Sequence, residues 1–216
     1  MATRRAGSRR LCGNGIVMKV FILGRAVHGE KFWLITTLSE EEGVLSCLIR
    51  QSTKKTGTIV PDLFDEAELS LERQKAGAEG PRFAKEYTLL ARHTGISGDY
   101  AGLVYASRFA TVLARNAFPP DARRSVLSLC RNAISAFSSK PRKDATYFKS
   151  LWLLARECGL PVREDWFESL PFDDKSCVSR VLKTPLEALD VPVREVERMV
   201  SRIEYWLAHE NEFSIS

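Results

Sequence analysis

Glu66-Ala-Glu-Leu-Ser-Leu-Glu72 is the stretch of sequence that decides the fold of the first half of the chain. Apolar and polar residues alternate strictly along it, so Ala67, Leu69 and Leu71 share one face while Ser70 and the glutamates share the other. A period of two is typical of a β-strand with one buried and one solvated face. The stretch therefore predicts a strand in the wall of a small sheet or barrel.

Four other short runs on either side of this stretch also predict strands. They are rich in β-branched and aromatic residues, and turns with glycine or clustered polar residues separate them. The expected strands cover residues 15–23, 31–38, 44–50 and 83–92. In the last of them we expect Phe83, Tyr87 and Leu89 to lie on one side. Five short strands in about eighty residues indicate a small barrel, of either the OB type or the SH3-like type.

From Ser97 onward the apolar period changes from two to nearly four, which is typical of amphipathic helices. We expect Ser97 to cap the first helix, which stops at Pro119-Pro120, Asp121 to open the second and Asp144 to cap the third. Shorter helices are expected at residues 176–182 and 185–189, and a final one at 193–208. The predicted fold class is α+β, with a barrel domain at 1–93, which includes a flexible basic arm at 1–12, and an all-α domain at 94–216.

The composition excludes several classes of protein. With 216 residues, of which 44% are hydrophobic and 27% charged, the chain is typical of a globular protein. No stretch approaches the ~18 apolar residues of a membrane-spanning helix, so we expect no membrane association and a cytoplasmic location. The five cysteines are scattered without a C-x-x-C pair, and only three histidines are present. We therefore expect no metal, no other cofactor and no disulfide framework.

Charge is unevenly distributed along the chain. Residues 1–60 carry a net charge of +6 and residues 94–163 carry +7, whereas residues 61–93 carry −2 and residues 164–216 carry −6. Two basic blocks indicate a polyanionic partner, and nucleic acid is the first candidate. Solvated protein surfaces also show such patterns, so the alternative is an ordinary solvated surface that binds no polyanion.

The candidate DNA-binding residues are cations in or near exposed loops. Arg50, Lys54 and Lys55 lie with several hydroxyl residues in a loop that leaves a strand, which suits contacts to phosphate. Further candidates are Arg25, which follows the first strand, and Arg123 and Arg124, which follow the Pro-Pro corner. The candidates for base stacking on an OB surface are Phe21, Phe32 and Trp33. The alternative is that they are core residues, as aromatic residues in strands more often are.

The sequence has few signs of catalysis. It contains no glycine-rich phosphate loop, no H-E-x-x-H and no G-x-S-x-G. Cys47 could pair with His28 or His93 as nucleophile and base, but its mid-strand position between apolar neighbours predicts a core thiol. Asp173-Asp174 is interpreted as a solvated turn. We therefore expect that the protein is not an enzyme.

The order of several short motifs resembles the bacterial recombination mediator family RecO. In that family a first strand is followed by an E-x-G-x-L-S turn, a basic loop and an F-x-x-x-E-L-x-L segment, and later in the helical half by an F-E-x-x-L-L-x-x-x-G-x-x-P segment. The segments that resemble these motifs here are Gly15-Ile-Val-Met-Lys19, Glu41-Glu-Gly-Val-Leu-Ser46, Phe64-Asp-Glu-Ala-Glu-Leu-Ser-Leu71 and Phe148-Lys-Ser-Leu-Trp-Leu-Leu-Ala-Arg-Glu-Cys-Gly-Leu-Pro161. The four-cysteine zinc module of many family members is missing, since only Cys158 and Cys177 occur in that region.

The resemblance implies an N-terminal OB-fold, a helical C-terminal domain and a non-enzymatic role in DNA repair. It implies binding of single- and double-stranded DNA, strand annealing and help in loading the recombinase RecA. RecR and the acidic C-terminal tail of single-strand-binding protein would be partners. An apolar pocket with a cationic rim would suit that tail, with Arg108 and Arg115 as the candidate rim. Contact of these two arginines with DNA is the alternative. The alternative function is a protein–protein adaptor in which the barrel is only a scaffold.

Overall fold

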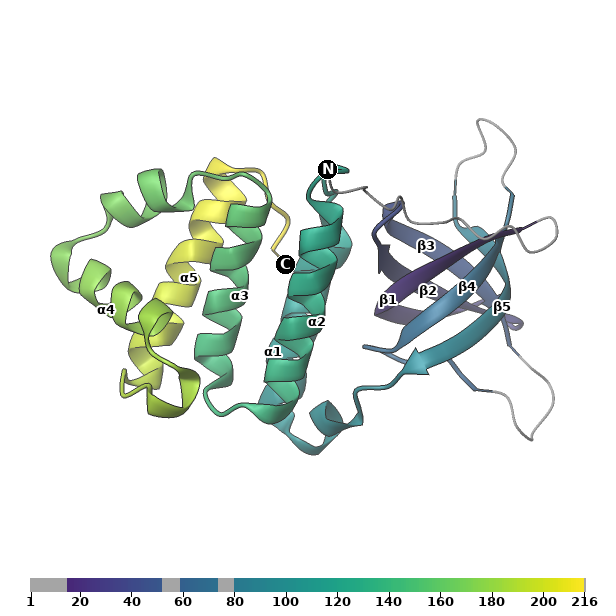
Figure 1. Cartoon of the computed structure of the whole chain (residues 1–216), viewed down its shortest axis with the longest axis horizontal. Helices are drawn as coiled ribbons and strands as arrows, with labels where there is room; N and C mark the ends of the chain where they lie inside the picture. Colours follow the sequence, from purple (N-terminus) through teal and green to yellow (C-terminus); the bar gives the residue numbers. More distant parts are fainter. Residues whose placement is uncertain (1–14, 52–58, 74–79, 216) are drawn as a thin grey trace, which may run out of the picture. The chain divides into compact units, whose positions relative to one another are not determined.

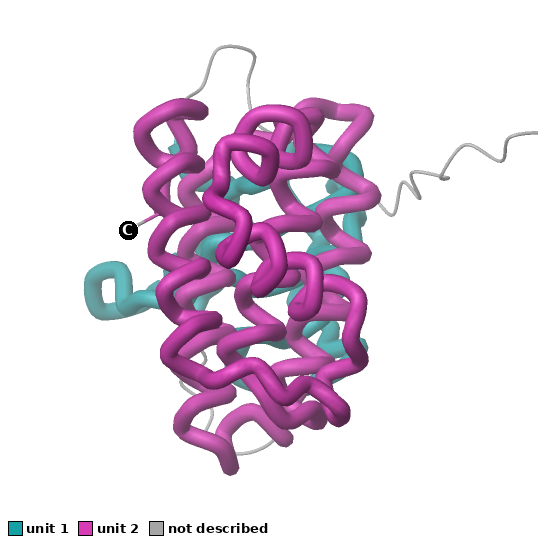
Figure 2. Tube along the Cα trace, turned by 90° about the vertical axis from the view of Figure 1, so that its left-hand side faces the viewer, with its two compact units in different colours: residues 1–92 teal, residues 93–216 magenta. Residues whose placement is uncertain are grey.

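The computed structural model describes residues 15–51, 59–73 and 80–215. The chain divides into two compact units, residues 1–92 and 93–216, which are coloured separately in Figure 2. The first unit is a β-barrel and the second is a bundle of helices (Figure 1). The expected basic arm at 1–12 lies outside the described residues.

The first unit is a closed barrel of five strands. They are β1 (Gly15–His28), β2 (Phe32–Ser39), β3 (Gly43–Arg50), β4 (Glu66–Glu72) and β5 (Arg82–Ala91). The strand order is β1-β2-β3-β5-β4, with β4 returning to β1. All neighbouring pairs are antiparallel except β3 and β5, which run parallel. This is an OB-type barrel, so the prediction of an OB barrel followed by helices is confirmed.

The alternating stretch in β4 forms one wall of the barrel interior, as its pattern predicts. Ala67, Leu69 and Leu71 are fully buried and pack in one cluster with residues of β1, β2 and β3. Cys47 belongs to this cluster, so its prediction as a core thiol is confirmed. The barrel therefore closes around an apolar centre that five short strands build jointly.

Phe83 does not lie where the sequence pattern placed it. The pairing of β4 with β5 shifts between Ser70 and Leu71: Ser70 pairs with Glu86, but Leu71 pairs with Ala84. The irregularity leaves an extra residue in β5 and reverses the side on which the preceding residues lie. Ala84 and Tyr87 consequently pack on the barrel core, while Phe83 is 46% exposed. The expectation that Phe83 and Tyr87 share one side is wrong.

The second unit consists of five α-helices and short intervening turns. After a 3₁₀ turn (Thr94–Gly98) come α1 (Tyr100–Arg115), α2 (Arg123–Ser139), α3 (Lys143–Glu157), a π-helical turn (Val162–Phe167), α4 (Phe172–Lys183), a 3₁₀ turn (Leu186–Ala188) and α5 (Val193–Glu210). Helix α3 packs against α1, α2 and α5. It is buried on most of its circumference, through Tyr147, Phe148, Leu151 and Leu154. Helix α3 is therefore the centre of the bundle.

The helix starts differ in detail from the expected ones. Asp99, not Ser97, caps α1, because its side chain accepts a hydrogen bond from the backbone N–H of Ala101. Helix α2 begins after Asp121, and Asp144 lies in the first turn of α3 rather than at its cap. No helix within the described ranges is long and apolar enough to cross a membrane.

Asp174 is buried, which makes the interpretation of Asp173-Asp174 as a solvated turn wrong for one of the two residues. Its carboxylate accepts hydrogen bonds from Arg198 and Arg202 on α5. Asp173 remains exposed. The ion pairs of Asp174 thus fix the first turn of α4 against α5, since a buried carboxylate needs its partners to remain charged.

Candidate nucleic-acid interface

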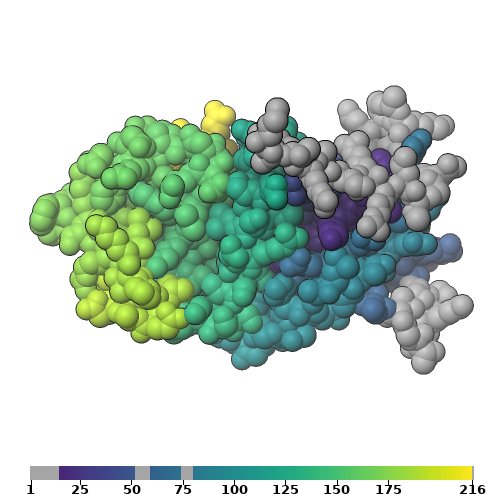
Figure 3. All heavy atoms as spheres, viewed as in Figure 1, coloured from purple at the N-terminus to yellow at the C-terminus, as the bar shows by residue number. Residues whose placement is uncertain are grey.

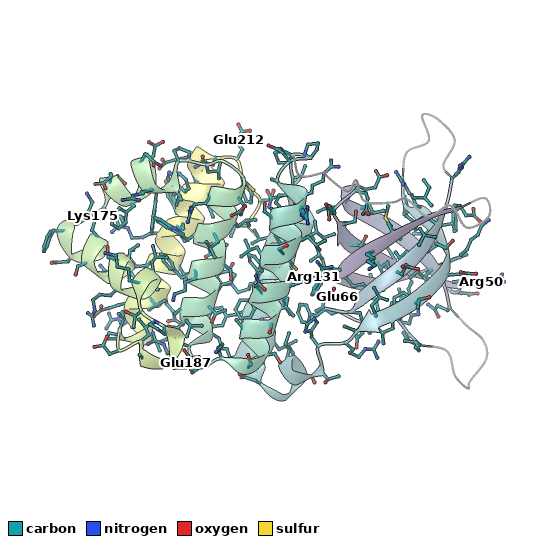
Figure 4. The ribbon with its side chains drawn as sticks, viewed as in Figure 1. Arg50, Glu66, Arg131, Lys175, Glu187 and Glu212 are labelled. Carbon is teal, nitrogen blue, oxygen red and sulfur yellow. The ribbon has the colours of Figure 1, made fainter. Side chains whose placement is uncertain are left out.

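Two aromatic rings and an arginine meet on the outer face of the barrel. In the sheet register Phe32 on β2 lies opposite Arg50 on β3, and Leu48 on β3 lies opposite Phe83 on β5. The rings of Phe32 and Phe83 pack edge to face with centroids 5.7 Å apart. Figure 4 shows Arg50 directed outward from the barrel. We call Phe32, Phe83 and Arg50 the stacking platform.

The platform lies where OB barrels bind oligonucleotides, which is the face of strands 2 and 3 with the loops between strands 1 and 2 and between strands 4 and 5. Phe32 is the first residue of β2, and Phe83 is the second residue of β5. Each aromatic residue therefore follows directly on one of these two loops. The ring of Phe83 is exposed and that of Phe32 is half-buried. Accessible rings next to a cation suit a single strand, because bases stack on the rings while the cation contacts phosphate.

Arg50 is exposed and makes no ion pair with another described residue. Gln51, the next residue, is held in place: its backbone N–H and its side chain donate to the carbonyl oxygens of Lys31 and Phe32, respectively. These bonds fix the point at which the basic loop leaves the barrel. Lys54 and Lys55 lie outside the described residues.

Arg25 lies away from the stacking platform, and its guanidinium interacts with other residues of the barrel. It lies opposite Ile35, on the same side of the sheet as Trp33, whereas Phe32 and Arg50 point to the other side. Its guanidinium lies 4.9 Å from the centroid of Trp33, donates to the carbonyl oxygen of Pro61 at 2.7 Å and is 3.5 Å from the Asp62 carboxylate. Arg25 therefore anchors the segment before β4, and the structure does not bring it together with Arg50.

Of the three aromatic residues considered for stacking, only Phe32 contributes to the platform. Phe21 is fully buried, and Trp33 packs against the barrel core. Phe83 was missed because a strict period of two assigns it to the core side. The signal that could have revealed the exposed position of Phe83 is the pair Lys85-Glu86, because two successive charged residues interrupt the alternation of apolar and polar residues in this strand.

Arg123 and Arg124 open α2 in the helical unit. Arg123 is half-buried and donates through Nε to the carbonyl oxygen of Phe118, which fixes the corner before the helix. Arg124 is exposed and lines an open groove of about 510 Å³ together with Asp121 and Glu157. The groove therefore carries acidic as well as basic groups.

Arg108 and Arg115, the expected rim of a peptide pocket, differ in their surroundings. Both Glu204 carboxylate oxygens accept from Arg108, at 2.9 and 3.1 Å, and Tyr147 donates its hydroxyl to Glu204 at 2.7 Å. Burial, together with the Glu204 carboxylate, raises the pKa of Tyr147 well above its usual range. Arg108 lines an open groove of about 500 Å³ that Arg115 does not line. Arg108 thus belongs to a hydrogen-bonded group with Glu204 and the buried Tyr147, and the two arginines form no common rim.

The positive block of residues 94–163 is partly neutralised by ion pairs. Lys140 pairs with Glu187 at 2.6 Å, and Lys143 pairs with Asp99 at 3.1 Å. Arg142 pairs with Asp144 at 2.8 Å, and this interaction raises the pKa of the arginine. Both Lys140 and Arg108 find their partners in the acidic block of residues 164–216. Because Glu187 and Glu204 lie outside residues 94–163, the net charge of +7 counted for that block overstates its positive potential.

The described residues contain no group of three or more histidine, cysteine, aspartate or glutamate side chains that could hold a metal ion. Cys47, Cys158 and Cys177 are free thiols. Burial raises the pKa of Cys47 to about 11, and the hydrogen bond with Thr37 and the charge of Arg82 only partly oppose this shift. A protonated thiol in an apolar barrel core is a poor nucleophile.

The sequence was compared with known proteins, and neither a family model nor a curated protein matches it. What the fold itself defines is a two-unit chain in which an OB-type barrel precedes a helical bundle.

Proposed function

We propose that this protein binds single-stranded nucleic acid through the stacking platform of its barrel. The observation that carries the proposal is the contact between Phe32 and Phe83 beside the exposed Arg50. Each base that stacks on an aromatic ring contributes about 1–3 kcal/mol whatever its identity, so the platform suits binding without sequence preference.

We further propose a RecO-like role in DNA repair and recombination. Its support is the order of RecO-like motifs along the sequence, together with an OB barrel that precedes a helical unit. In this role the protein binds single- and double-stranded DNA, anneals strands and assists RecA loading, with RecR and the tail of single-strand-binding protein as partners. Annealing requires that phosphate repulsion is neutralised while base edges stay free, which stacking on ring faces permits.

The test is a fluorescence-anisotropy titration with a single-stranded oligonucleotide at two salt concentrations. Arg50→Ala should weaken binding and lower the salt slope by about 1, because one phosphate contact is lost. Lys19→Ala is the matched control, since Lys19 is an exposed cation on β1 of the same barrel. No binding by the wild-type protein at low salt, or an equal loss in both variants, would refute the proposal.

A protein–protein adaptor is the second candidate, and the neutralised cations of the helical unit favour it. An adaptor does not need an exposed positive surface on its helices. The titration separates the two functions: an adaptor shows no salt-dependent oligonucleotide binding, and Arg50→Ala has no effect on it.

A further inference from the structure

Between α3 and α4 lies an open cleft of about 910 Å³. Its floor is apolar and includes Leu153, Leu160 and Leu182. Its rim carries Arg156, Arg163 and Lys183, with Glu164 as the one acidic residue among the lining side chains. The cleft belongs wholly to the helical unit, and none of the candidate DNA-binding residues of the sequence lines it.

The three rim cations differ from Lys140, Arg142 and Lys143, which form ion pairs within this unit. Arg156, Arg163 and Lys183 are exposed, and none of them makes an ion pair with another described residue. Lys149 also lines the cleft, but it donates to the carbonyl oxygen of Thr184, and Arg180 nearby on α4 pairs with Asp190. A cleft with an apolar floor and unneutralised cations is complementary to an apolar group that carries an adjacent carboxylate.

The N-terminal end of α4 presents an apolar group with an adjacent carboxylate. Phe172, the first residue of α4, is 84% exposed, and the exposed Asp173 follows it. The ion pairs of Asp174 with Arg198 and Arg202 hold this turn against α5, so the Phe172 ring is presented on a fixed backbone. Figure 1 shows α4 at the outside of the helical bundle, and the space-filling view in Figure 3 shows the atoms of this region at the surface.

Phe172 and the cleft also share one face of α4. Ser179 and Lys183 both line the cleft, and they follow Phe172 by seven and eleven residues. At 100° per residue these spacings return to within about 20° of the same direction, and eleven residues span roughly 16 Å. Ser176, near the middle of this face, is small and exposed, so a second helix could approach closely there.

We propose that two copies of this chain associate through α4, with the two helices antiparallel about a two-fold axis. This arrangement places Phe172 of each copy at the cleft of the other copy and brings Asp173 to the Lys183 side of the partner's rim. A two-fold axis satisfies both contacts at once and closes the assembly at two copies. The Lys183 ammonium gains the ring face of Phe172 as well as the carboxylate of Asp173. This association goes beyond the proposed nucleic-acid binding and does not depend on it.

The test is sedimentation velocity of the full chain over a wide concentration range. The wild-type protein should show a reversible monomer–dimer equilibrium, and Phe172→Ala should raise the dimer dissociation constant about tenfold or more. Asp173→Lys and Lys183→Glu should each weaken the dimer, whereas the double variant with both changes should restore it, because it exchanges the two charges across the interface.

The matched control is Tyr100→Ala, which removes an equally exposed aromatic residue from the first turn of α1. It should leave the equilibrium unchanged, and circular dichroism should show that all variants fold. A wild-type protein that stays monomeric at high concentration overturns the proposal. The proposal is also overturned if Phe172→Ala leaves the dimer intact or if the double variant does not restore association. A monomer whose cleft instead captures a labelled acidic peptide overturns it as well.

Discussion

Phe32 on β2 and Phe83 on β5 pack edge to face on the outside of the barrel, with their ring centroids 5.7 Å apart and their planes at 73°. The two strands are not neighbours in the sheet, because β3 lies between them. The contact therefore spans three strands and covers Leu48, which is largely buried. Two rings that support each other in this way keep a fixed orientation without a bound ligand, which lowers the entropy cost of binding a base.

We expect Phe83→Ala to weaken binding of a single-stranded oligonucleotide by about 1–3 kcal/mol. The salt dependence should stay as in the wild-type protein, because the ring contributes stacking and no charge. Anisotropy titrations at several salt concentrations measure both quantities. Leu90→Ala is the matched control, since Leu90 is another exposed apolar residue of β5. An equal loss in the two variants would show that exposed apolar area, not stacking, causes the effect.

The sequence predicts the strands well because a period of two depends only on neighbouring residues. Ala67, Leu69 and Leu71 therefore lie where the pattern placed them. The position of Phe83 depends on the register shift between β4 and β5, a property of the pair of strands that neither strand shows alone.

The same limit applies to the candidate cations. The partner of Arg108 is Glu204, which lies 96 residues further along the chain, and the partner of Lys140 is Glu187. Spacing on a single helix shows which side chains share a face, but it does not show which helix packs there. For this reason the sequence identified the cations, whereas only the structure separates Arg50 from those that are neutralised by ion pairs at the protein's surface.

We expect Asp65→Asn to destabilise the barrel by about 3 kcal/mol at neutral pH, at the lower end for a buried ion pair because Arg92 is partly solvated. Asp65 is fully buried, and its carboxylate accepts from Arg92 at 2.7 and 2.6 Å and from the Tyr87 hydroxyl at 2.8 Å. Burial alone would raise the pKa of Asp65, but these hydrogen bonds outweigh it and hold the pKa below its usual value. Amide hydrogen exchange of β4 and β5 measures the stability.

The lowered pKa of Asp65 also gives the pH dependence a definite sign. A carboxylate with a depressed pKa in the folded state contributes its stability above the unfolded-state pKa of about 4, and this contribution is lost as the pH falls below that value. The wild-type barrel should therefore lose stability below about pH 4 more steeply than Asp65→Asn does. The same acid dependence in both proteins would exclude Asp65 as the responsible group.

Arg108→Ala should destabilise the helical unit by about 1–2 kcal/mol, while Arg115→Ala should change its stability by less than about 0.5 kcal/mol. Removal of Arg108 leaves Glu204, whose side chain is mostly buried, with Tyr147 as its hydrogen-bond donor. Arg115 is exposed at the end of α1 and makes no ion pair with a described residue. Thermal unfolding of the two variants decides the matter, and equal stability would show that Arg108 is not a structural residue.

Cys47 should resist alkylation in the native protein at pH 8 and react fully in urea. Its thiol is buried in the barrel core, and burial raises its pKa to about 11, so little thiolate forms at that pH. Mass spectrometry after iodoacetamide treatment measures the modified fraction at this residue. Cys47→Ala should retain oligonucleotide binding, although it loses packing in the core. Rapid native alkylation of Cys47 would instead show an accessible, activated thiol and would favour the nucleophilic role that its position in the core argues against.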